Sequence, residues 1–199
     1  MNGKRILTYA LAAILATAFV VPVSAKTYEI DRAHSSVGFS IRHMAISKTK
    51  GTFDDFAGSF SYDPAKPDSW QCEAVIQATS INTGNEKRDD HLRNPDFFDV
   101  ATHPTITFKS TAVELNDDGE GTLKGNLTMH GVTKEIEMDL ELVGLLPESP
   151  FGDSRAGFTA TGKLDRKDFG LTWNRAMETG GLVVGNEVKI TIEVEGIAK

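Results

Sequence analysis

The sequence has little of what a disulfide-stapled or nucleic-acid-binding protein needs. Cys72 is the one cysteine among 199 residues, so no disulfide forms within the chain. Small exported domains often depend on several disulfides, so this fold must depend on its own apolar core. Basic residues are also outnumbered, with 21 Lys and Arg against 28 Asp and Glu and a net charge of −7. Without a basic stripe, binding to nucleic acid or to an anionic membrane surface is not expected.

Motifs for catalysis and metal binding are missing as well. No Gly-x-Ser-x-Gly motif marks a serine hydrolase. The five histidines, at positions 34, 43, 91, 103 and 130, are never closer than nine residues in sequence. Structural zinc sites usually draw on closely spaced pairs, so we expect no metal site, although folding could bring three histidines together. The sequence therefore predicts neither a catalytic residue nor a metal.

The N-terminus has the pattern of a secretory signal peptide. Lys4 and Arg5 precede the uncharged residues 6–23, and Val23-Ser24-Ala25 supplies small residues for cleavage after Ala25. An uncleaved membrane anchor is the alternative reading. An exported chain without a disulfide fits the bacterial periplasm. We therefore predict a signal peptide over residues 1–25 and a single periplasmic domain over residues 26–199, which is not membrane-integral.

Apolar and polar residues alternate through most of the remaining sequence, as in strands with one buried face. The clearest case is residues 135–142, where acids alternate with Ile136, Met138, Leu140 and Leu142. Eight such segments occur, at residues 37–41, 53–62, 72–78, 105–109, 123–129, 135–142, 158–164 and 187–195. The turn-forming residues between them leave short connections, which favour antiparallel neighbours.

This pattern predicts an all-β fold, an eight-stranded antiparallel up-and-down barrel with the form of a lipocalin-like calyx. Too little helix remains to cover an open sheet of eight strands, whereas closing the sheet buries its apolar face and removes its edges. A two-sheet sandwich is the alternative, because periodicity does not report closure.

Residues 84–104 interrupt the alternation and predict a short helix over one mouth of the barrel. Thr83 and Glu86 have the spacing of a capping box, and Asn94-Pro95 is a stop signal, which together give a helix of about ten residues. Arg88, His91 and Leu92 would share the face toward the mouth, while Asp89 would pair with Arg93. Adjacent Asp89 and Asp90 diverge on a helix, so a solvated face is favoured over a catalytic acid pair.

A further loop segment, residues 168–185, is irregular and predicts a second cover for the mouth. The polar and lid residues expected to contact a ligand there are His43, Arg88, His91, Phe97, Phe98 and Trp173. For His43, which points inward at a strand end, a hydrogen-bonded structural histidine is the favoured reading over a ligand contact.

Inward-facing positions define the expected lumen. The apolar lumen candidates are Val37, Phe39, Ile41, Phe60, Ile76, Phe108, Leu127, Met138, Leu140, Phe158, Ala160, Ile190 and Ile192. Cys72 is in the same phase and is expected to be a small buried apolar residue. Side chains can fill a small eight-stranded barrel completely. The small residues predicted to face inward argue for open space instead: Ala74, Ala78, Ala112, Gly125, Ala156, Ala160 and Gly162.

Several segments together resemble the YceI-like family, and the resemblance spans essentially the whole predicted mature chain, residues 26–199. They are "YEIDRAHSSVGFSIRHM", "GTFDDFAGSFSYDP", "SINTGNEKRDDHLRNPDFFDVATHPTITFKS", "LKGNLTMHGVTKEIEM" and "RAGFTATGKLDRKDFGLTWN". The most specific part is Arg88-Asp89-x-His91-Leu92, followed by Asp96-Phe97-Phe98-Asp99 and Pro104-x-Ile106-x-Phe108.

The resemblance implies a periplasmic, non-catalytic lipocalin-like barrel whose lumen holds a long-chain polyisoprenoid or similar amphiphilic lipid, with no cofactor. Two alternatives remain, an enzyme acting on a lipid-like isoprenoid substrate through Arg88, Asp89 and His91, and a purely structural protein. The identity of the lipid, its head group (phosphate or quinone), its donor and acceptor, and formation of a homodimer are left open by the sequence.

Overall fold

A computed structural model describes residues 25–63, 66, 69–116, 118–178 and 180–199. The predicted signal peptide, residues 1–25, lies outside the described residues except for Ala25. Within the described ranges, no helix has the length and apolar character needed to span a bilayer.

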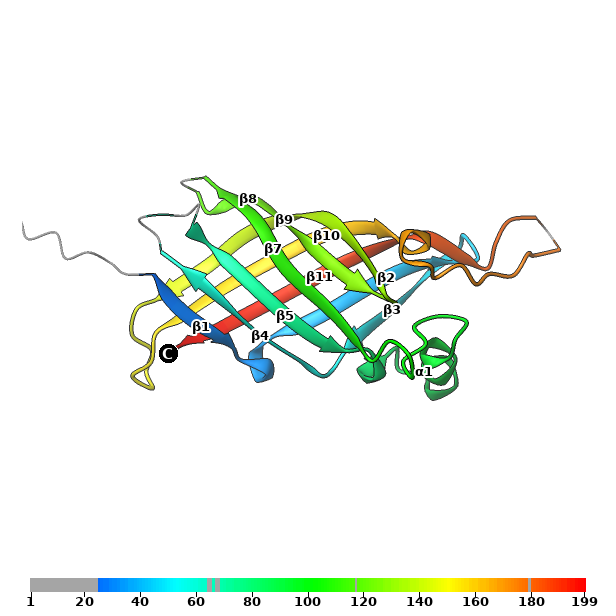
Figure 1. Ribbon diagram of the computed structural model, residues 1–199, viewed down its shortest axis with the longest axis horizontal. Helices are drawn as coiled ribbons and strands as arrows, with labels where there is room; N and C mark the ends of the chain where they lie inside the picture. The colour runs from blue at the N-terminus through cyan, green and yellow to red at the C-terminus, as the bar shows by residue number, and fades with distance from the viewer. Residues whose placement is uncertain (1–24, 64–65, 67–68, 117, 179) are drawn as a thin grey trace, which may run out of the picture.

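The described residues form eleven strands and one α-helix, arranged as Figure 1 shows. The strands are β1 (Lys26–Ile30), β2 (Ser36–His43), β3 (Ser47–Phe53), β4 (Phe56–Tyr62), β5 (Gln71–Gln77), β6 (Ile81–Asn82), β7 (Thr105–Leu115), β8 (Glu120–Met129), β9 (Val132–Leu146), β10 (Arg155–Asp165) and β11 (Val184–Ala198). The helix is α1 (Glu86–Arg93), and short 3-10 turns are η1 (Arg32–His34), η3 (Ala78–Ser80) and η4 (Arg166–Phe169).

The sheet closes into a barrel. The order β1-β4-β5-β7-β8-β9-β10-β11 returns to β1 through a β1–β11 ladder, and every pairing is antiparallel. The predicted eight-stranded up-and-down barrel is therefore confirmed, and the sandwich alternative is wrong. Each of the eight predicted segments lies mostly on a different strand: β2, β4, β5, β7, β8, β9, β10 or β11.

At three of the eight strand positions around the barrel, two shorter strands follow one another in place of one long strand. The alternation pattern did not show these interruptions. β1 and β2 both pair with β11 and are separated by η1, while β3 and β4 are separated by Asp54 and Asp55. β6 continues β5 after η3 and pairs with β3. The strands β2, β3 and β6 thus lengthen one end of the barrel, and the predicted single segment at residues 53–62 begins at the end of β3.

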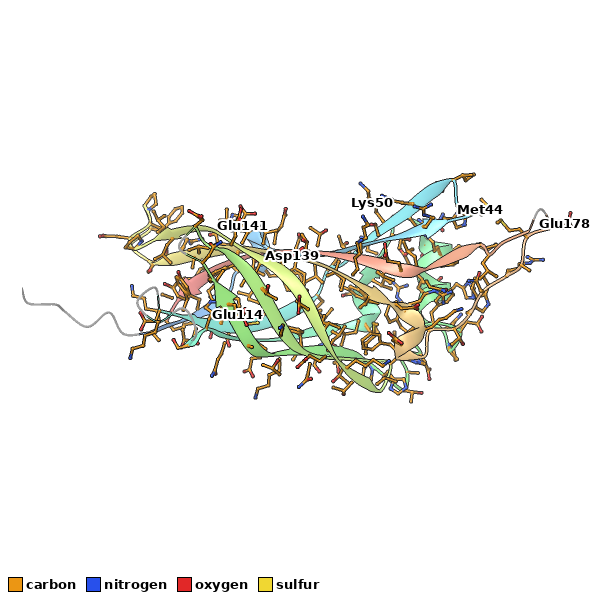
Figure 2. All side chains as sticks on the ribbon, turned by 90° about the horizontal axis from the view of Figure 1, so that it is seen from above. Met44, Lys50, Glu114, Asp139, Glu141 and Glu178 are labelled. Carbon is orange, nitrogen blue, oxygen red and sulfur yellow. The ribbon has the colours of Figure 1, made fainter. Side chains whose placement is uncertain are left out.

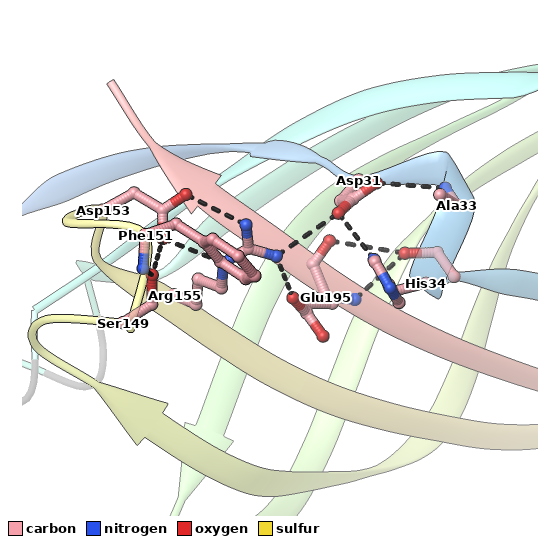
Figure 3. Close-up of polar contacts among 9 residues, drawn as sticks. Asp31, Ala33, His34, Ser149, Phe151, Asp153, Arg155 and Glu195 are labelled. Carbon is pink, nitrogen blue, oxygen red and sulfur yellow. Dashed lines mark hydrogen bonds and ion pairs between the residues drawn. The ribbon is translucent and has the colours of Figure 1, made fainter.

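A network around Arg155 fixes the break between β1 and β2 (Figure 3). Arg155 Nε donates to Asp153 at 2.9 Å, and its Nη1 lies 3.4 Å from Asp31. Asp31 in turn accepts from the backbone N–H of Ala33 and lies 2.8 Å from the His34 ring. The hydrogen bond with Asp153, followed by that with Glu195, raises the pKa of Arg155, and the same partnership lowers the pKa of Asp153. This network ties η1 to β10 and β11.

The outer wall is acidic and the inner wall apolar. Glu114, Asp139 and Glu141 project from the outside of the sheet (Figure 2), whereas Met138 and Leu140, which alternate with the last two, are each 3 % exposed. One phase prediction is wrong, because a register shift between Ser110 and Ala112 reverses the faces of β7. Ala112 is therefore exposed, and its neighbour Val113 is buried.

Aromatic side chains close the end of the barrel opposite α1. Phe158 packs against Trp70, Phe60 and Tyr62, with ring centroids 4.8, 5.3 and 5.5 Å apart. Tyr28 stacks on Phe60 at 5.0 Å. A second apolar cluster, which includes Phe53, Ile81, Phe169 and Leu171, lies toward α1.

Candidate functional site

A cavity of about 420 Å³ lies inside the barrel. Small-molecule sites are commonly about 300–1,000 Å³, so this volume is that of a ligand site. Every one of the predicted lumen residues lines it: Val37, Phe39, Ile41, Phe60, Ile76, Phe108, Leu127, Met138, Leu140, Phe158, Ala160, Ile190 and Ile192. The side chains therefore do not fill the barrel completely.

The open space does not come from all of the small residues that were expected to provide it. Ala74 and Ala160 line the cavity. At Gly125, however, an added Cβ would lie 2.3 Å from the Phe108 ring, and at Gly162 it would lie 2.8 Å from Met138. These two glycines make room for neighbouring side chains on the same wall, so they do not widen the lumen.

The end of the barrel that carries α1 also carries residues 166–178 and 180–183 (Figure 1), and we call this end the mouth. All six residues predicted there line the cavity: His43, Arg88, His91, Phe97, Phe98 and Trp173. The His91 ring contacts Phe97 and Trp173 edge to face, with centroids 5.1 and 5.0 Å apart. Trp173 therefore joins the segment after β10 to the helix, and both predicted covers meet over one mouth.

The Phe-Phe pair after α1 points inward as expected. Phe97 is buried, and Phe98 packs edge to face on Phe53 with centroids 5.6 Å apart. The expected hydrogen bond of the His43 side chain is absent among the described residues, although its imidazole lines the cavity.

The start of α1 differs from the predicted capping box. Asn85 is the N-cap, and its side chain accepts from the Arg88 N–H at 3.0 Å. The helix has eight residues, where about ten were expected, and ends before Asn94-Pro95 as predicted. The Thr83 hydroxyl does not cap the helix, because it donates to Asp89 and accepts from Arg88 Nε.

Asp89 is buried, which corrects its assignment to a solvated face. It is 6 % exposed and accepts from both the backbone N–H and the hydroxyl of Thr83. Asp90 is exposed and pairs with Arg93 at 3.0 Å, so the predicted Asp89–Arg93 pair is also wrong. The periodicity of a short, highly charged helix gave no sign of which acid would face the preceding loop.

Arg166 is a cavity residue that the sequence analysis missed. It is 3 % exposed, lines the cavity, and donates from Nε to the Gly185 carbonyl at 2.8 Å and from Nη1 to the Leu171 carbonyl. Its Nη2 is buried without a hydrogen-bond partner among the described residues. Burial lowers the pKa of Arg166, and the nearby Asp165 opposes that shift. In the sequence it lies within the polar run Asp165-Arg166-Lys167-Asp168, which carries no signal of burial.

Folding brings two of the dispersed histidines together. The rings of His103 and His130 are 4.8 Å apart, and together with Asp99 they offer ligand atoms within 4.8 Å of one another. His130 Nδ1 lies 3.2 Å from the Phe169 carbonyl, which would leave Nε2 for an ion. Asp31, His34 and Glu195 form a second such group, but both of its carboxylates already pair with Arg155.

We expect Cys72 to be unreactive in the folded protein. It lines the cavity, and burial raises the pKa of its thiol to about 12. The thiolate is the reactive form, and at pH 8 only about one molecule in 10⁴ would carry it. Reaction with a thiol reagent such as Ellman's reagent should therefore be at least about a hundredfold slower in buffer than in 8 M urea. Equal rates in the two solvents would show that Cys72 is accessible.

Comparison with known proteins agrees with this architecture. The YceI-like domain model matches residues 28–196. Protein YceI of Salmonella newport is 37% identical over 196 residues, which cover 98% of this chain and 97% of that one. The crystal structure of the Campylobacter jejuni YCEI protein superposes with a TM-score of 0.69 at 34% identity, covering 85% of this chain and 96% of that one. A polyisoprenoid binding domain from Saccharophagus degradans shares the fold, with a TM-score of 0.63 at 19% identity over 86% of this chain and 98% of that one.

Proposed function

The chain belongs to the YceI-like family, and from that premise we propose that it is a periplasmic carrier that holds a long-chain polyisoprenoid or similar amphiphilic lipid. The observation that carries this proposal is the cavity itself, which runs through an apolar barrel interior and has polar side chains gathered at one mouth. A solved polyisoprenoid binding domain of the same fold supports this class of ligand.

The lumen fits such a ligand energetically. Each methylene moved from water to an apolar site contributes about 0.8 kcal/mol, so several isoprene units supply a large gross driving force. Ordering a flexible chain and losing its free motion offset much of that gain. The tail therefore provides affinity with little selectivity, and the polar mouth is left to select the head group.

The arrangement of the mouth supports binding over catalysis. The residues considered for an enzyme are engaged with one another or with the loop: Arg88 donates to Thr83 from Nε and Nη2, and Asp89 accepts from Thr83. His91 Nε2 lies 2.9 Å from Asp96. No poised nucleophile, with a base beside it, occurs among these groups. We also propose that a signal peptide at residues 1–25 directs the export of the protein to the periplasm.

Protein purified from a bacterial periplasm is expected to carry a long-chain amphiphile. Mass spectrometry of an organic extract should detect one dominant lipid class at about one molecule per chain. An unrelated periplasmic protein, purified and extracted in parallel, serves as the control for carried-over membrane lipid. A chain that yields no more lipid than this control would contradict the proposed function.

A further inference from the structure

Arg166 carries hydrogen-bond donors that nothing in the described part of the protein uses. A guanidinium has five N–H groups, and Arg166 directs one from Nε to Gly185 and one from Nη1 to Leu171. Nη2 has two more, and it is buried with no acceptor among the described residues. Because Arg166 lines the cavity, the unused donors lie beside the space that a ligand would occupy.

The positive charge of Arg166 has the nearby carboxylate of Asp165 but no direct ion pair among the described residues. Removing a guanidinium from water costs several kcal/mol unless an anion pairs with it. No ion pair to Arg166 occurs among the described residues, and the adjacent carboxylate of Asp165 accepts from the Lys167 N–H. The hydrogen bonds to the Leu171 and Gly185 carbonyls show that Arg166 holds these two segments together. They do not explain a buried charge whose third nitrogen is unpaired.

Burial sets Arg166 apart from the other charged groups of the cavity. Arg42, Arg88 and Glu73 also line the cavity among the described residues, but they are exposed, so water screens their charges. Arg88 is also engaged with Thr83 through Nε and Nη2. Arg166, which is 3 % exposed, is therefore the charged residue of the described cavity lining that most needs a partner of opposite sign.

We propose that Arg166 binds an anionic head group, a carboxylate or a phosphate, of the amphiphile whose tail lies in the lumen. The inference rests on the proposed carrier function and specifies the head group that the mouth selects. Nη2 and the remaining N–H of Nη1 are neighbouring donors, which suits two oxygens of one oxyanion. A neutral carbonyl or hydroxyl head would accept one hydrogen bond but leave the buried charge uncompensated.

Three ligands that share the same tail and differ in the head group separate the contribution of the head to binding from that of the tail in the lumen. Geranylgeranyl phosphate, geranylgeranoic acid and geranylgeraniol are titrated into delipidated protein, with the fluorescence of Trp173 and Trp70 as the signal. We expect the wild-type protein to bind both anions at least tenfold more tightly than the alcohol. In Arg166→Met, affinity for both anions should fall by about tenfold to a hundredfold, the value of a hydrogen bond to a charged group, and affinity for the alcohol should change little.

Two further variants keep the test decisive. Arg93→Met is the matched control, because Arg93 also donates to two backbone carbonyls, those of Thr79 and Ile81, but does not line the cavity. It should leave the preference for anions unchanged even if it lowers the melting temperature. Arg166→Lys keeps the charge but loses the planar fork, so it should retain part of the preference. If Arg166→Met does not fold, the reduced preference of Arg166→Lys supports the proposal, and an unreduced one overturns it.

The remaining outcomes distinguish this inference from the carrier function. Equal losses for all three ligands in Arg166→Met would make Arg166 a structural clamp and overturn the inference alone. The same conclusion follows if the wild-type protein binds the alcohol as tightly as the anions. If it binds none of the three, the proposed function fails as well. Stronger binding of the phosphate or of the carboxylate identifies which oxyanion the mouth prefers.

Discussion

Ala160→Phe is expected to empty the barrel of lipid while leaving the protein folded. Ala160 lies in the middle of β10, faces the cavity, and pairs with Leu140 and Ile192 on the neighbouring strands. A phenyl ring at this position would occupy space that the tail of the ligand needs. The lipid recovered by mass spectrometry should therefore fall to background, with the melting temperature of the lipid-free protein nearly unchanged.

Thr161→Phe is the control for this substitution. Thr161 is exposed and pairs with Asp139 and Thr191 on the outer face, so the same ring there should spare both lipid content and melting temperature. If the interior at Ala160 were already packed, Ala160→Phe would instead cost about 1–3 kcal/mol of folding free energy. Retained lipid with a lowered melting temperature would contradict the placement of Ala160 beside the ligand.

Phe158→Ala is expected to cost about 3–5 kcal/mol in the free energy of unfolding, the range found for aromatic residues in cores. Phe158 is 4 % exposed and packs on Trp70, Phe60 and Tyr62 at the closed end of the barrel. Its removal takes away the common partner of three rings and opens a void that joins the cavity. Urea unfolding of the lipid-free proteins measures the loss, with the same dependence of the unfolding free energy on urea concentration (m-value) used for the wild type and the variant.

Phe151→Ala is the matched change at the surface. Phe151 is 83% exposed, and its ring lies 5.5 Å from the Arg155 guanidinium. Only a cation–π contact is lost, so the cost should stay below about 1 kcal/mol. A loss for Phe158→Ala as small as this would mean that the aromatic cluster does not hold the closed end.

Strict alternation predicted the long, uninterrupted strands. In β9, acidic residues point outward and Met138 and Leu140 inward, because a half-buried strand must repeat every two residues. Where the pairing of the strands is irregular, the alternation of residue types no longer predicts which face of the sheet a side chain occupies. Ala112 was assigned to the inside because the register shift beside it leaves no sequence signal. The break between β3 and β4 was missed because it is only two residues long and lies between the apolar Phe53 and Phe56. The break at η1 was missed because residues 26–30, which form β1, were not among the predicted segments.

The mouth was predictable in its apolar parts and less so in its polar parts. Phe97, Phe98 and Trp173 could be placed because large aromatic side chains need a surface to cover them. The burial of Asp89 and Arg166 depends on hydrogen bonds to Thr83, Leu171 and Gly185, which no pattern of residue types reveals. Tertiary contacts of this kind decide whether a charge is solvated or buried, and here they decided where the unpaired donor lies.

The position of β11 in the ladder has a consequence for biosynthesis. β11 is the last of the described strands in sequence, and it pairs with β10, with β2 and with β1, the first. On the ribosome, every earlier strand can join its neighbour, but the ring cannot close until residues 184–198 have emerged. Such long-range pairing also makes folding slow compared with helical proteins. A nascent chain of this topology therefore keeps its ring of strands open for almost the whole of its synthesis.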